Sequence, residues 1–321
     1  MELFKNSKIF NFIGLSKWLL GASFILILIS LYLFFGKGFQ VGIDFAGGTL
    51  AQLRYEKTAP IEQIRNILEN KSEFKGLVVT KYGSDSDVLL KLRQFEGGKN
   101  LGENISSYLK PTGNFEIIKL DSVGARVGSE LREKGVLSLV IAILAMMAYV
   151  SFRYEWRFAL AGIFALVHDI IIASASIIIF RIDLNLEVIA ALLTLLGYSI
   201  NDTIIIFDRI RERMLASRNE DVKYVINEAI SSTLSRTMLT SLTVFFVVLV
   251  LYLFGGKNIV GFSLPMLVGV VVGTYSSLFV APAMAILFRF NIAKYRSKEF
   301  EKQKRAEEKR KLRAQYEGGV V

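Results

Sequence analysis

The stretch Gly197-Tyr-Ser-Ile-Asn-Asp-Thr-Ile-Ile-Ile-Phe-Asp-Arg-Ile-Arg-Glu212 completes an apolar run and carries one carboxylate, Asp202, inside it. Apolar runs of about 20 residues match a bilayer core about 30 Å thick. Asp202 precedes the charged pair Asp208 and Arg209 by about six residues, which is about 9 Å at the helical rise. Because an ionisable group at this depth is costly, the stretch predicts a membrane span with a functional carboxylate.

Five further apolar runs predict that the chain crosses the membrane six times. The composition agrees, with 52% hydrophobic residues, 21% charged residues and a mean hydropathy of +0.43. A purely soluble enzyme is thereby excluded. The first run is too long for the apolar part of a signal peptide and is expected to be retained. The predicted spans are 18–35, 135–152, 158–180, 187–207, 237–254 and 260–288.

The distribution of lysine and arginine predicts that both termini are cytoplasmic. Basic residues gather in four segments, which are 1–17, 153–157, 209–223 and the tail 289–321, with eleven in the tail. The opposite short loops carry one each, Arg181 and Lys257. Since positive charge is retained in the cytoplasm, the polar segment 36–134 is expected to face outward, beside a bundle that continues over 135–288.

Segment 36–134 has no apolar run long enough to cross a bilayer, and its pattern predicts an α+β domain. Helices are expected at 60–70 and 100–109, and strands at 48–55, 77–82, 88–95 and 115–121. The order βαββαβ is that of a ferredoxin-like sandwich. The predicted fold class is therefore an α-helical membrane protein, with a six-helix bundle and an inserted ferredoxin-like α+β domain outside the cytoplasm.

The inserted domain has no paired carboxylates, nucleophile motif or phosphate-binding loop. Its glycine pairs, Gly47-Gly48 and Gly97-Gly98, are interpreted as turns. We assign the domain to binding or coupling rather than to catalysis.

The chain has no cysteine and a single histidine, His168. Disulfides, thiolate metal sites and cysteine nucleophiles are therefore excluded, and a histidine-rich metal site or a Ser-His-Asp hydrolase is not expected. The chain also lacks the G-x-G-D motif of intramembrane aspartyl proteases, so this activity is not expected. We predict no metal, no cofactor and no enzymatic activity.

A second polar face, at the start of the fifth predicted span, carries Arg236. The fourth and fifth spans are consecutive and antiparallel, so Arg236 and Asp202 lie at comparable depth and can pair. Their pairing predicts a proton switch, while a fixed ion pair that only sets helix packing is the alternative. Neighbouring polar groups on the two helices are Tyr198, Ser199, Asn201 and Thr240.

His168 and Asp169 form another ionisable pair, in the third predicted span. The pair is compatible with a second relay station and with a satisfied hydrogen bond between helices. In the sixth span, small residues that include Gly269, Gly273 and Ser277 recur every four positions. Such a stripe permits close helix packing, and a sliding surface for motion is the alternative.

The tail contains a charged run from Lys298 to Arg313 without periodic apolar residues. It is expected to be a solvated helix, or to contact anionic lipid headgroups or an acidic or RNA-rich partner such as a ribosome-bound chain. No motif accompanies the charge that would read a nucleic-acid sequence.

The segment from Gly197 to Glu212 resembles the fourth-span signature of the SecD/SecF family, in the RND superfamily. Other segments resemble further signatures of that family in the same order, namely Val41-Gly-Ile-Asp-Phe-Ala-Gly-Gly-Thr49, His168-Asp169, Thr233-Leu-Ser-Arg-Thr237, Leu253-Phe-Gly-Gly256 and Gly273-Thr-Tyr-Ser-Ser277. The chain departs from the pattern at Ala125, where proline is expected. This difference is expected to loosen the junction before the second span.

The resemblance implies a SecF-like accessory subunit of the Sec translocase in the bacterial inner membrane, which works with SecD and uses the proton-motive force in late steps of protein export. Asp202 is then the proton carrier and Arg236 its charge partner. The implied partners are SecD, the SecYEG channel, the SecA ATPase and exported preproteins, with YajC and YidC as further candidates. The alternatives are an RND-type proton-coupled exporter of lipid or small molecules, and a scaffold of the Sec complex that transports nothing.

Overall fold

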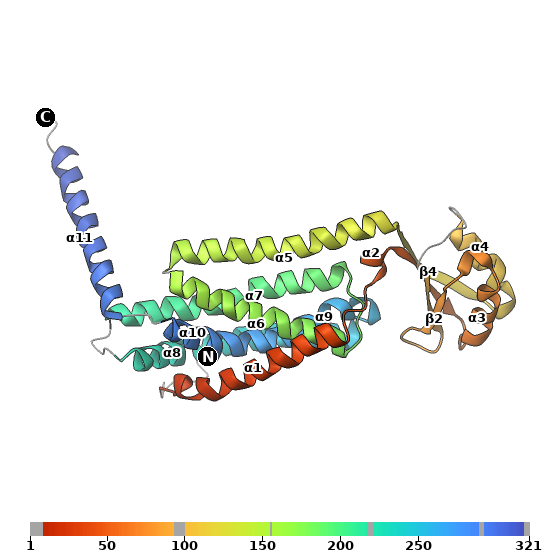
Figure 1. The fold of residues 1–321 in the computed structure, drawn as a ribbon, viewed down its shortest axis with the longest axis horizontal. Coiled ribbons are helices and arrows are strands. Elements are labelled where there is room, and N and C mark those ends of the chain that lie inside the picture. Colours follow the sequence, from red (N-terminus) through yellow and green to blue (C-terminus); the bar gives the residue numbers. More distant parts are fainter. Residues whose placement is uncertain (1–8, 93–99, 155, 217–220, 289–291, 318–321) are drawn as a thin grey trace.

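The computed structural model describes residues 9–92, 100–154, 156–216, 221–288 and 292–317. Six helical segments in this part of the chain are long and apolar enough to cross a membrane. They lie side by side as a bundle, with a sheet domain at one end and a separate helix leaving the other end (Figure 1). We call these the sheet-domain end and the tail end.

The bundle contains five long helices and a sixth segment built from consecutive turns. The long helices are α1 (Phe12–Gly36), α5 (Ala125–Arg153), α6 (Trp156–Ile179), α7 (Leu186–Ala216) and α8 (Val222–Phe254). The sixth segment comprises η3 (Lys257–Ile259), α9 (Val260–Tyr275), the π-helical turn η4 (Ser276–Val280) and α10 (Ala281–Leu287). Helices α5 and α8 begin well before the predicted spans, which start at 135 and 237. Their first turns contain polar residues, and a span predicted from hydropathy includes only the apolar part of a helix.

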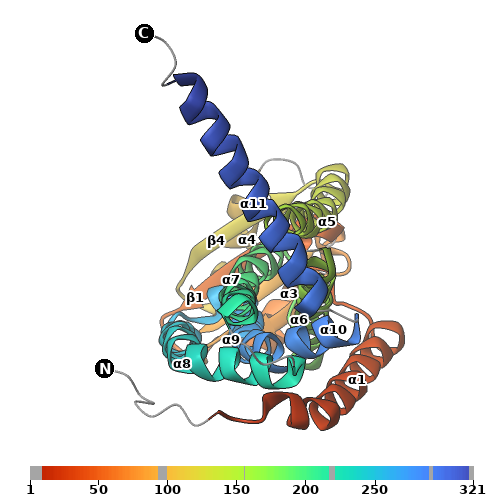
Figure 2. The ribbon, with the colours of Figure 1, turned by 90° about the vertical axis from the view of Figure 1, so that its left-hand side faces the viewer.

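The bundle has an inner and an outer set of helices. The apolar stretches of α6, α7 and the segment that contains α9 are mostly buried, whereas only 11%, 11% and 17% of those of α1, α5 and α8 are buried. Figure 2 shows α1, α5 and α8 around the outside of the bundle, with α9 between them. Exposed apolar faces of this extent are those that a bilayer would cover.

The sheet domain follows the predicted order of strands and helices. Its elements are β1 (Gly48–Tyr55), α3 (Ile61–Glu69), η1 (Ser72–Phe74), β2 (Val78–Lys81), β3 (Asp87–Leu92), α4 (Leu101–Leu109), η2 (Lys110–Thr112) and β4 (Phe115–Val123). The strands form an antiparallel sheet in the order β2-β3-β1-β4. Leu53 and Leu90 from the sheet pack with Ile64 and Ile105 from α3 and α4, and all four are fully buried. The predicted end of the third strand, at residues 93–95, lies outside the described residues.

A short helix, α2 (Ile43–Ala46), packs against the start of α5 and joins the bundle to the sheet. Gly47 follows α2 with φ +72°, and a Cβ atom there would lie 2.6 Å from Cα of Ala125. A Cβ atom at Gly128 would likewise lie 2.8 Å from the nitrogen of Gly47. Interpreting Gly47-Gly48 as a simple turn was therefore incomplete, because Gly47 also lets two backbones approach closely.

Ala125 is the first residue of α5. Proline is favoured at this position because its missing N–H is not needed there, but alanine fits the same backbone. Ala125 lies close to the backbone of Gly47 at this junction, and the expected loosening relative to proline stays a prediction.

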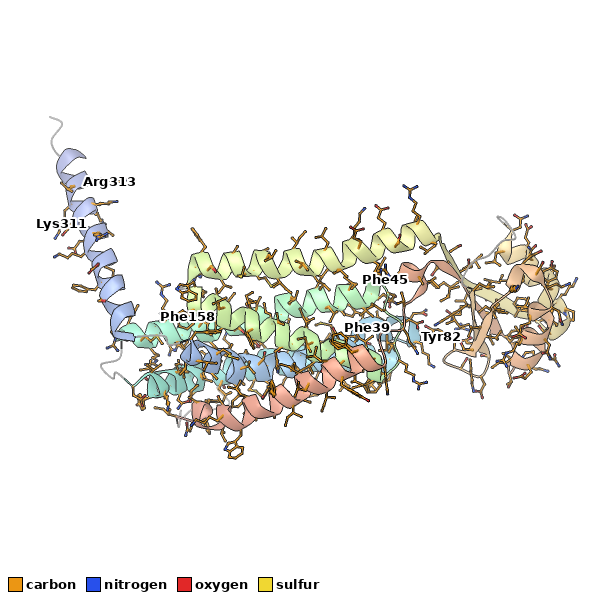
Figure 3. All side chains as sticks on the ribbon, viewed as in Figure 1. Phe39, Phe45, Tyr82, Phe158, Lys311 and Arg313 are labelled. Carbon is orange, nitrogen blue, oxygen red and sulfur yellow. The ribbon has the colours of Figure 1, made fainter. Side chains whose placement is uncertain are left out.

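The sheet domain is also held to the two loops at its end of the bundle. Lys91 on β3 forms an ion pair with Asp183 in the loop between α6 and α7. The Tyr82 hydroxyl donates a hydrogen bond to Oδ1 of Asn258, in η3, at 2.6 Å. Figure 3 shows Tyr82 on the side of the domain that faces the bundle. The domain therefore contacts loops that are continuous with α6, α7, α8 and α9.

The segment before α2 makes a third contact with the loop between α6 and α7. The Leu184 N–H donates to the carbonyl of Gln40 at 2.7 Å, and the Gly42 N–H donates to the carbonyl of Leu184 at 2.9 Å. Asp44 in α2 accepts from the Leu186 N–H at 3.0 Å and so caps the start of α7. These bonds fix the direction in which the chain enters the sheet.

We expect the sheet domain to lose stability in acid through Asp87. The Arg54 guanidinium donates to both carboxylate oxygens of Asp87, at 2.9 and 3.1 Å, and holds the pKa of that carboxyl below its ordinary value. A carboxyl with a lowered folded pKa stabilises the fold above its unfolded pKa of about 4, and this stability disappears as pH falls through the folded pKa. Hydrogen exchange of β3 amides, corrected for intrinsic rates, should therefore accelerate below about pH 4.

Asp87→Asn should flatten that dependence of exchange on pH. Asp85→Asn is the matched control, because Asp85 pairs with Lys81 on the exposed surface. The same acid dependence in Asp87→Asn as in the unmodified chain would contradict the assignment.

Candidate functional site

Asp202 lies on α7, where α7, α8 and α9 meet. Its side chain is 1% exposed. Oδ2 accepts a hydrogen bond from the Ser241 hydroxyl of α8 at 3.2 Å, and the Thr274 hydroxyl of α9 lies 2.8 Å from Ser241. Three helices therefore share one hydrogen-bonded chain that ends on the carboxyl.

Several buried polar atoms on α7 and α8 have no hydrogen-bond partner among the described residues. They include Oδ1 of Asp202, the hydroxyl of Tyr198, four residues before Asp202, and the hydroxyl of Thr237, four residues before Ser241. An ionised carboxylate with an unpartnered oxygen is costly in an apolar interior, whereas a protonated carboxyl costs less. We call Tyr198, Asp202, Thr237, Ser241 and Thr274 the Asp202 cluster. The cluster is suited to taking up and releasing a proton.

The predicted ion pair between Asp202 and Arg236 is not formed in this structure. Arg236 is exposed on α8, and no ion pair within 4.0 Å joins these two described residues. Thr237, the next residue, is fully buried, and one residue turns a helix by about 100°. Arg236 therefore lies on the exposed side of α8, next to the face that carries Thr237.

The other predicted neighbours of Asp202 separate into two groups. Tyr198 belongs to the Asp202 cluster, whereas Asn201 is exposed. Thr240 is also exposed, and its hydroxyl donates to its own helix, 3.1 Å from the Arg236 carbonyl. Ser199 faces Asp169 rather than Asp202. On α7, Ser199 and Tyr198 lie three and four residues before Asp202, so they are displaced to opposite sides of it around the helix axis.

A second buried cluster surrounds Asp169 on α6. Oδ1 of Asp169 lies 2.8 Å from Nδ1 of His168, and Oδ2 accepts from Ser199 at 2.5 Å and Ser276 at 2.7 Å. His168 Nε2 lies 3.1 Å from the hydroxyl of Ser23 on α1. The set continues to Tyr275, whose hydroxyl is 2.8 Å from that of Ser23. We call Ser23, His168, Asp169, Ser199, Tyr275 and Ser276 the Asp169 cluster.

The small residues of α9 bring the helices of both clusters together. A Cβ atom at Gly269 would lie 2.5 Å from Leu195 of α7, and one at Gly273 would lie 3.2 Å from Cβ of Ser199. Ser277 is fully buried and donates to the carbonyl of Thr274 at 3.0 Å. The predicted stripe therefore lies in a close contact between α9 and α7 at Gly269 and Gly273.

The hydroxyl groups that complete these clusters were assigned no role from the sequence; they are Ser23, Thr237, Ser241, Thr274, Tyr275 and Ser276. Thr237 and the run from Thr274 to Ser276 lie within the segments that resemble family signatures, whereas Ser23 and Ser241 offered only an isolated hydroxyl in an apolar run, and many such groups bond only to their own helix. In the part of the chain that the structure describes, no group of three or more His, Cys, Asp or Glu side chains is placed to hold a metal ion.

Comparisons with known proteins agree on one family. The family model described as "Protein export membrane protein SecD/SecF, C-terminal" matches residues 104–291, and the model described as "SecD/SecF GG Motif" matches residues 32–59. The second match contains Gly47 and the close backbone contact described above.

The chain is 57% identical to Protein translocase subunit SecF of Helicobacter pylori (strain J99), with all of both chains covered. It is 36% identical to the protein of that name from Escherichia coli O157:H7, over 89% of this chain and 90% of the relative.

Among solved structures, the crystal structure of SecDF, a translocon-associated membrane protein from Thermus thermophilus, matches with a TM-score of 0.80 and 34% identity. The match covers 90% of this chain but only 40% of the SecDF chain. A second crystal structure of SecDF, in a super-membrane-facing form, matches with a TM-score of 0.65. The chain belongs to the SecD/SecF family of protein export membrane proteins.

Proposed function

We propose that this chain is an accessory subunit of the Sec translocase that uses the proton-motive force, with SecD, to promote late steps of protein export. The observation that carries the proposal is the buried Asp202, with one oxygen bonded to Ser241 and the other unpartnered. Its relatives bear the name Protein translocase subunit SecF, which supports protein as the cargo. The proton gradient is then the energy source, and no cofactor takes part.

The proposed architecture is an RND-like bundle of six helices with a ferredoxin-like domain outside the cytoplasm. The order β2-β3-β1-β4 and the two helices on one face of the sheet support the ferredoxin-like assignment. The protein crosses the bacterial inner membrane several times. The excess of basic residues in 1–17 and 289–321 supports cytoplasmic termini.

SecD is the first proposed partner, because the chain spans about 40% of the SecDF chain that it matches. The rest of the proton path is expected to come from SecD, and the exposed Arg236 lies on a surface that a second subunit can cover. The SecYEG channel, SecA, YajC, YidC and exported preproteins complete the proposed set. In the tail, α11 (Ile292–Glu317) leaves the bundle at the end opposite the sheet domain, which supports contact with anionic lipid (Figure 1).

The proposed mechanism begins with a proton reaching Asp202. Protonation removes the charge that the Ser241 hydroxyl and Arg236 stabilise, so the packing of α7 against α8 and α9 shifts. The loops at the sheet-domain end are continuous with these helices and hold the domain through Lys91 and Tyr82. A shift in the bundle is thereby passed to the domain that meets the exported chain.

Vesicles that contain this chain, SecD and the Sec channel test the proposal. Preprotein translocation should be faster with a proton gradient than without one. Arg236→Ala should remove most of this difference, because Asp202 loses the cation that acts on it. Arg132→Ala is the matched control, since Arg132 is exposed near the start of α5 and its loss changes net charge equally.

Three results would contradict the proposal. A translocation rate that is the same with and without the gradient would contradict proton coupling. Proton flux stimulated by lipid or small molecules without any Sec channel would favour an RND-type exporter. If Arg236→Ala and Arg132→Ala changed the gradient-dependent translocation rate equally, Arg236 would have no specific role in the proton path.

A further inference from the structure

We infer that His168 and Asp169 form a buried imidazolium–carboxylate pair, which holds a proton at a second site linked to Asp202 through α9. The protonation state follows from the hydrogen bonds of the Asp169 cluster alone. Only the role of the pair in coupling rests on the proposed function.

The hydrogen bonds on the α1 side require a proton on Nε2 of His168. Tyr275 has one hydroxyl hydrogen and donates it to the carbonyl of Leu19 at 2.7 Å. The contact of 2.8 Å between Ser23 and Tyr275 is therefore donated by Ser23. Since the only hydrogen of Ser23 is then used, Ser23 accepts from His168 across 3.1 Å, and Nε2 must carry a hydrogen.

The hydrogen bonds on the α7 and α9 side favour a charged Asp169. Its Oδ2 lies 2.5 Å from the Ser199 hydroxyl and 2.7 Å from the Ser276 hydroxyl. The Gly273 carbonyl is a second acceptor near Ser276 but lies farther away, at 3.1 Å, so both hydroxyls donate to Asp169. Two such donors stabilise a carboxylate in an interior where Asp169 is 1% exposed. Oδ1 then accepts from Nδ1 of His168 at 2.8 Å, so both ring nitrogens of His168 carry hydrogen.

The surroundings supply no competing charge in contact with the pair. Among the described residues, the hydrogen bonds and ion pairs of the two side chains involve Ser23 on α1, Ser199 on α7 and Ser276 in η4. The titratable group that faces them from another helix is Tyr275, whose ring centre lies 6.1 Å from that of His168. The positive ring and the negative carboxylate therefore balance each other.

Helix α9 connects this pair to Asp202. Thr274 contacts Ser241 of the Asp202 cluster, and Ser276, two residues later, donates to Asp169. Ser276 also opens the π-helical turn η4, a distortion that is frequent at functional sites. A displacement of Thr274 when Asp202 takes up a proton would move Ser276. The hydrogen bond from Ser276 to Asp169 would then weaken, and the Asp169 carboxylate would retain the proton on His168 less strongly.

The single histidine of the chain makes the protonation state directly measurable. The untagged chain is labelled with ¹⁵N-histidine and assembled with unlabelled SecD in lipid nanodiscs, and its imidazole resonances are recorded by NMR. At neutral pH, both ring nitrogens should carry hydrogen, as the hydrogen bonds to Ser23 and Asp169 require. A neutral ring under these conditions would overturn the inference whatever the translocation assays show.

Variants separate the pair from its surroundings. Asp169→Asn removes the balancing charge and should leave His168 neutral, and an unchanged imidazolium signal would contradict the pairing. Asp202→Asn, which imitates a protonated Asp202, should shift the His168 resonances through α9. Asp208→Asn, on the same helix but at the exposed pair with Arg153, should not shift them. A shift that is absent in Asp202→Asn, or equal in the two variants, would overturn the link.

Discussion

Asp202→Asn is expected to reduce preprotein translocation to the rate measured without a proton gradient, while the complex with SecD still assembles. Asparagine keeps the volume of the side chain and can accept from Ser241, which lies 3.2 Å away, but it cannot exchange a proton. All of the gradient-dependent stimulation should therefore disappear. Translocation in vesicles with and without the gradient measures it, and co-purification with SecD measures assembly.

Asp208→Asn is the matched control for this experiment. Asp208 lies on the same helix, but it is partly exposed and 3.6 Å from Arg153, so its charge is screened by water. The control should keep the gradient-dependent stimulation. If Asp202→Asn keeps it too, Asp202 is only a packing residue, and if Asp202→Asn loses assembly together with stimulation, the scaffold function is favoured.

Gly47→Ala is expected to destabilise the junction between the sheet domain and the bundle severely. Gly47 has φ +72°, and its added Cβ would lie 2.6 Å from Cα of Ala125, a backbone atom that no rotamer change can move away. With ψ 161°, this backbone lies in a region essentially confined to glycine, which costs an alanine about 1–3 kcal/mol, and overpacking of this kind adds about 1–3 kcal/mol. Hydrogen exchange in α2 and the first turns of α5 should therefore increase markedly.

Gly76→Ala separates the two contributions. Gly76 has φ +80°, but a Cβ there would meet no atom within 4 Å, so this variant carries the backbone strain without the clash. Its melting temperature in detergent should lie between those of the unmodified chain and Gly47→Ala. Equal melting temperatures for the two variants would show that the junction can open without loss.

The elements that the sequence predicts well are those set by local periodicity. The first strand, at 48–55, has the bounds of β1, because alternating side chains determine a strand within its own residues. The helices at 60–70 and 100–109 and the apolar spans follow the same logic. The junction at Gly47 escapes this approach, since its contact with Ala125 joins residues distant in sequence.

The site is predicted less completely than the fold, because helix rotation decides which side chains meet. The depth of Asp202 followed from the charged end of its run, but the outward direction of Arg236 depends on how α8 packs with Thr237 and Ser241 inside. The contact between Ser23 and His168 joins α1 to α6 across 145 residues. The sequence around Ser23 does not indicate a contact with His168, and the sequence around His168 does not indicate one with Ser23.

The central position of β1 has a consequence for synthesis of the protein. β1 pairs with β3 on one side and β4 on the other, and Gly48 at its start is opposite Val123 at the end of β4. In the proposed orientation, with the sheet domain outside the cytoplasm, a nascent chain of which only α1 and β1 have emerged has neither partner strand available. The sheet can therefore close only when the segment through residue 123 has emerged, immediately before α5 enters the bilayer. Completion of this sheet therefore directly precedes insertion of the second span.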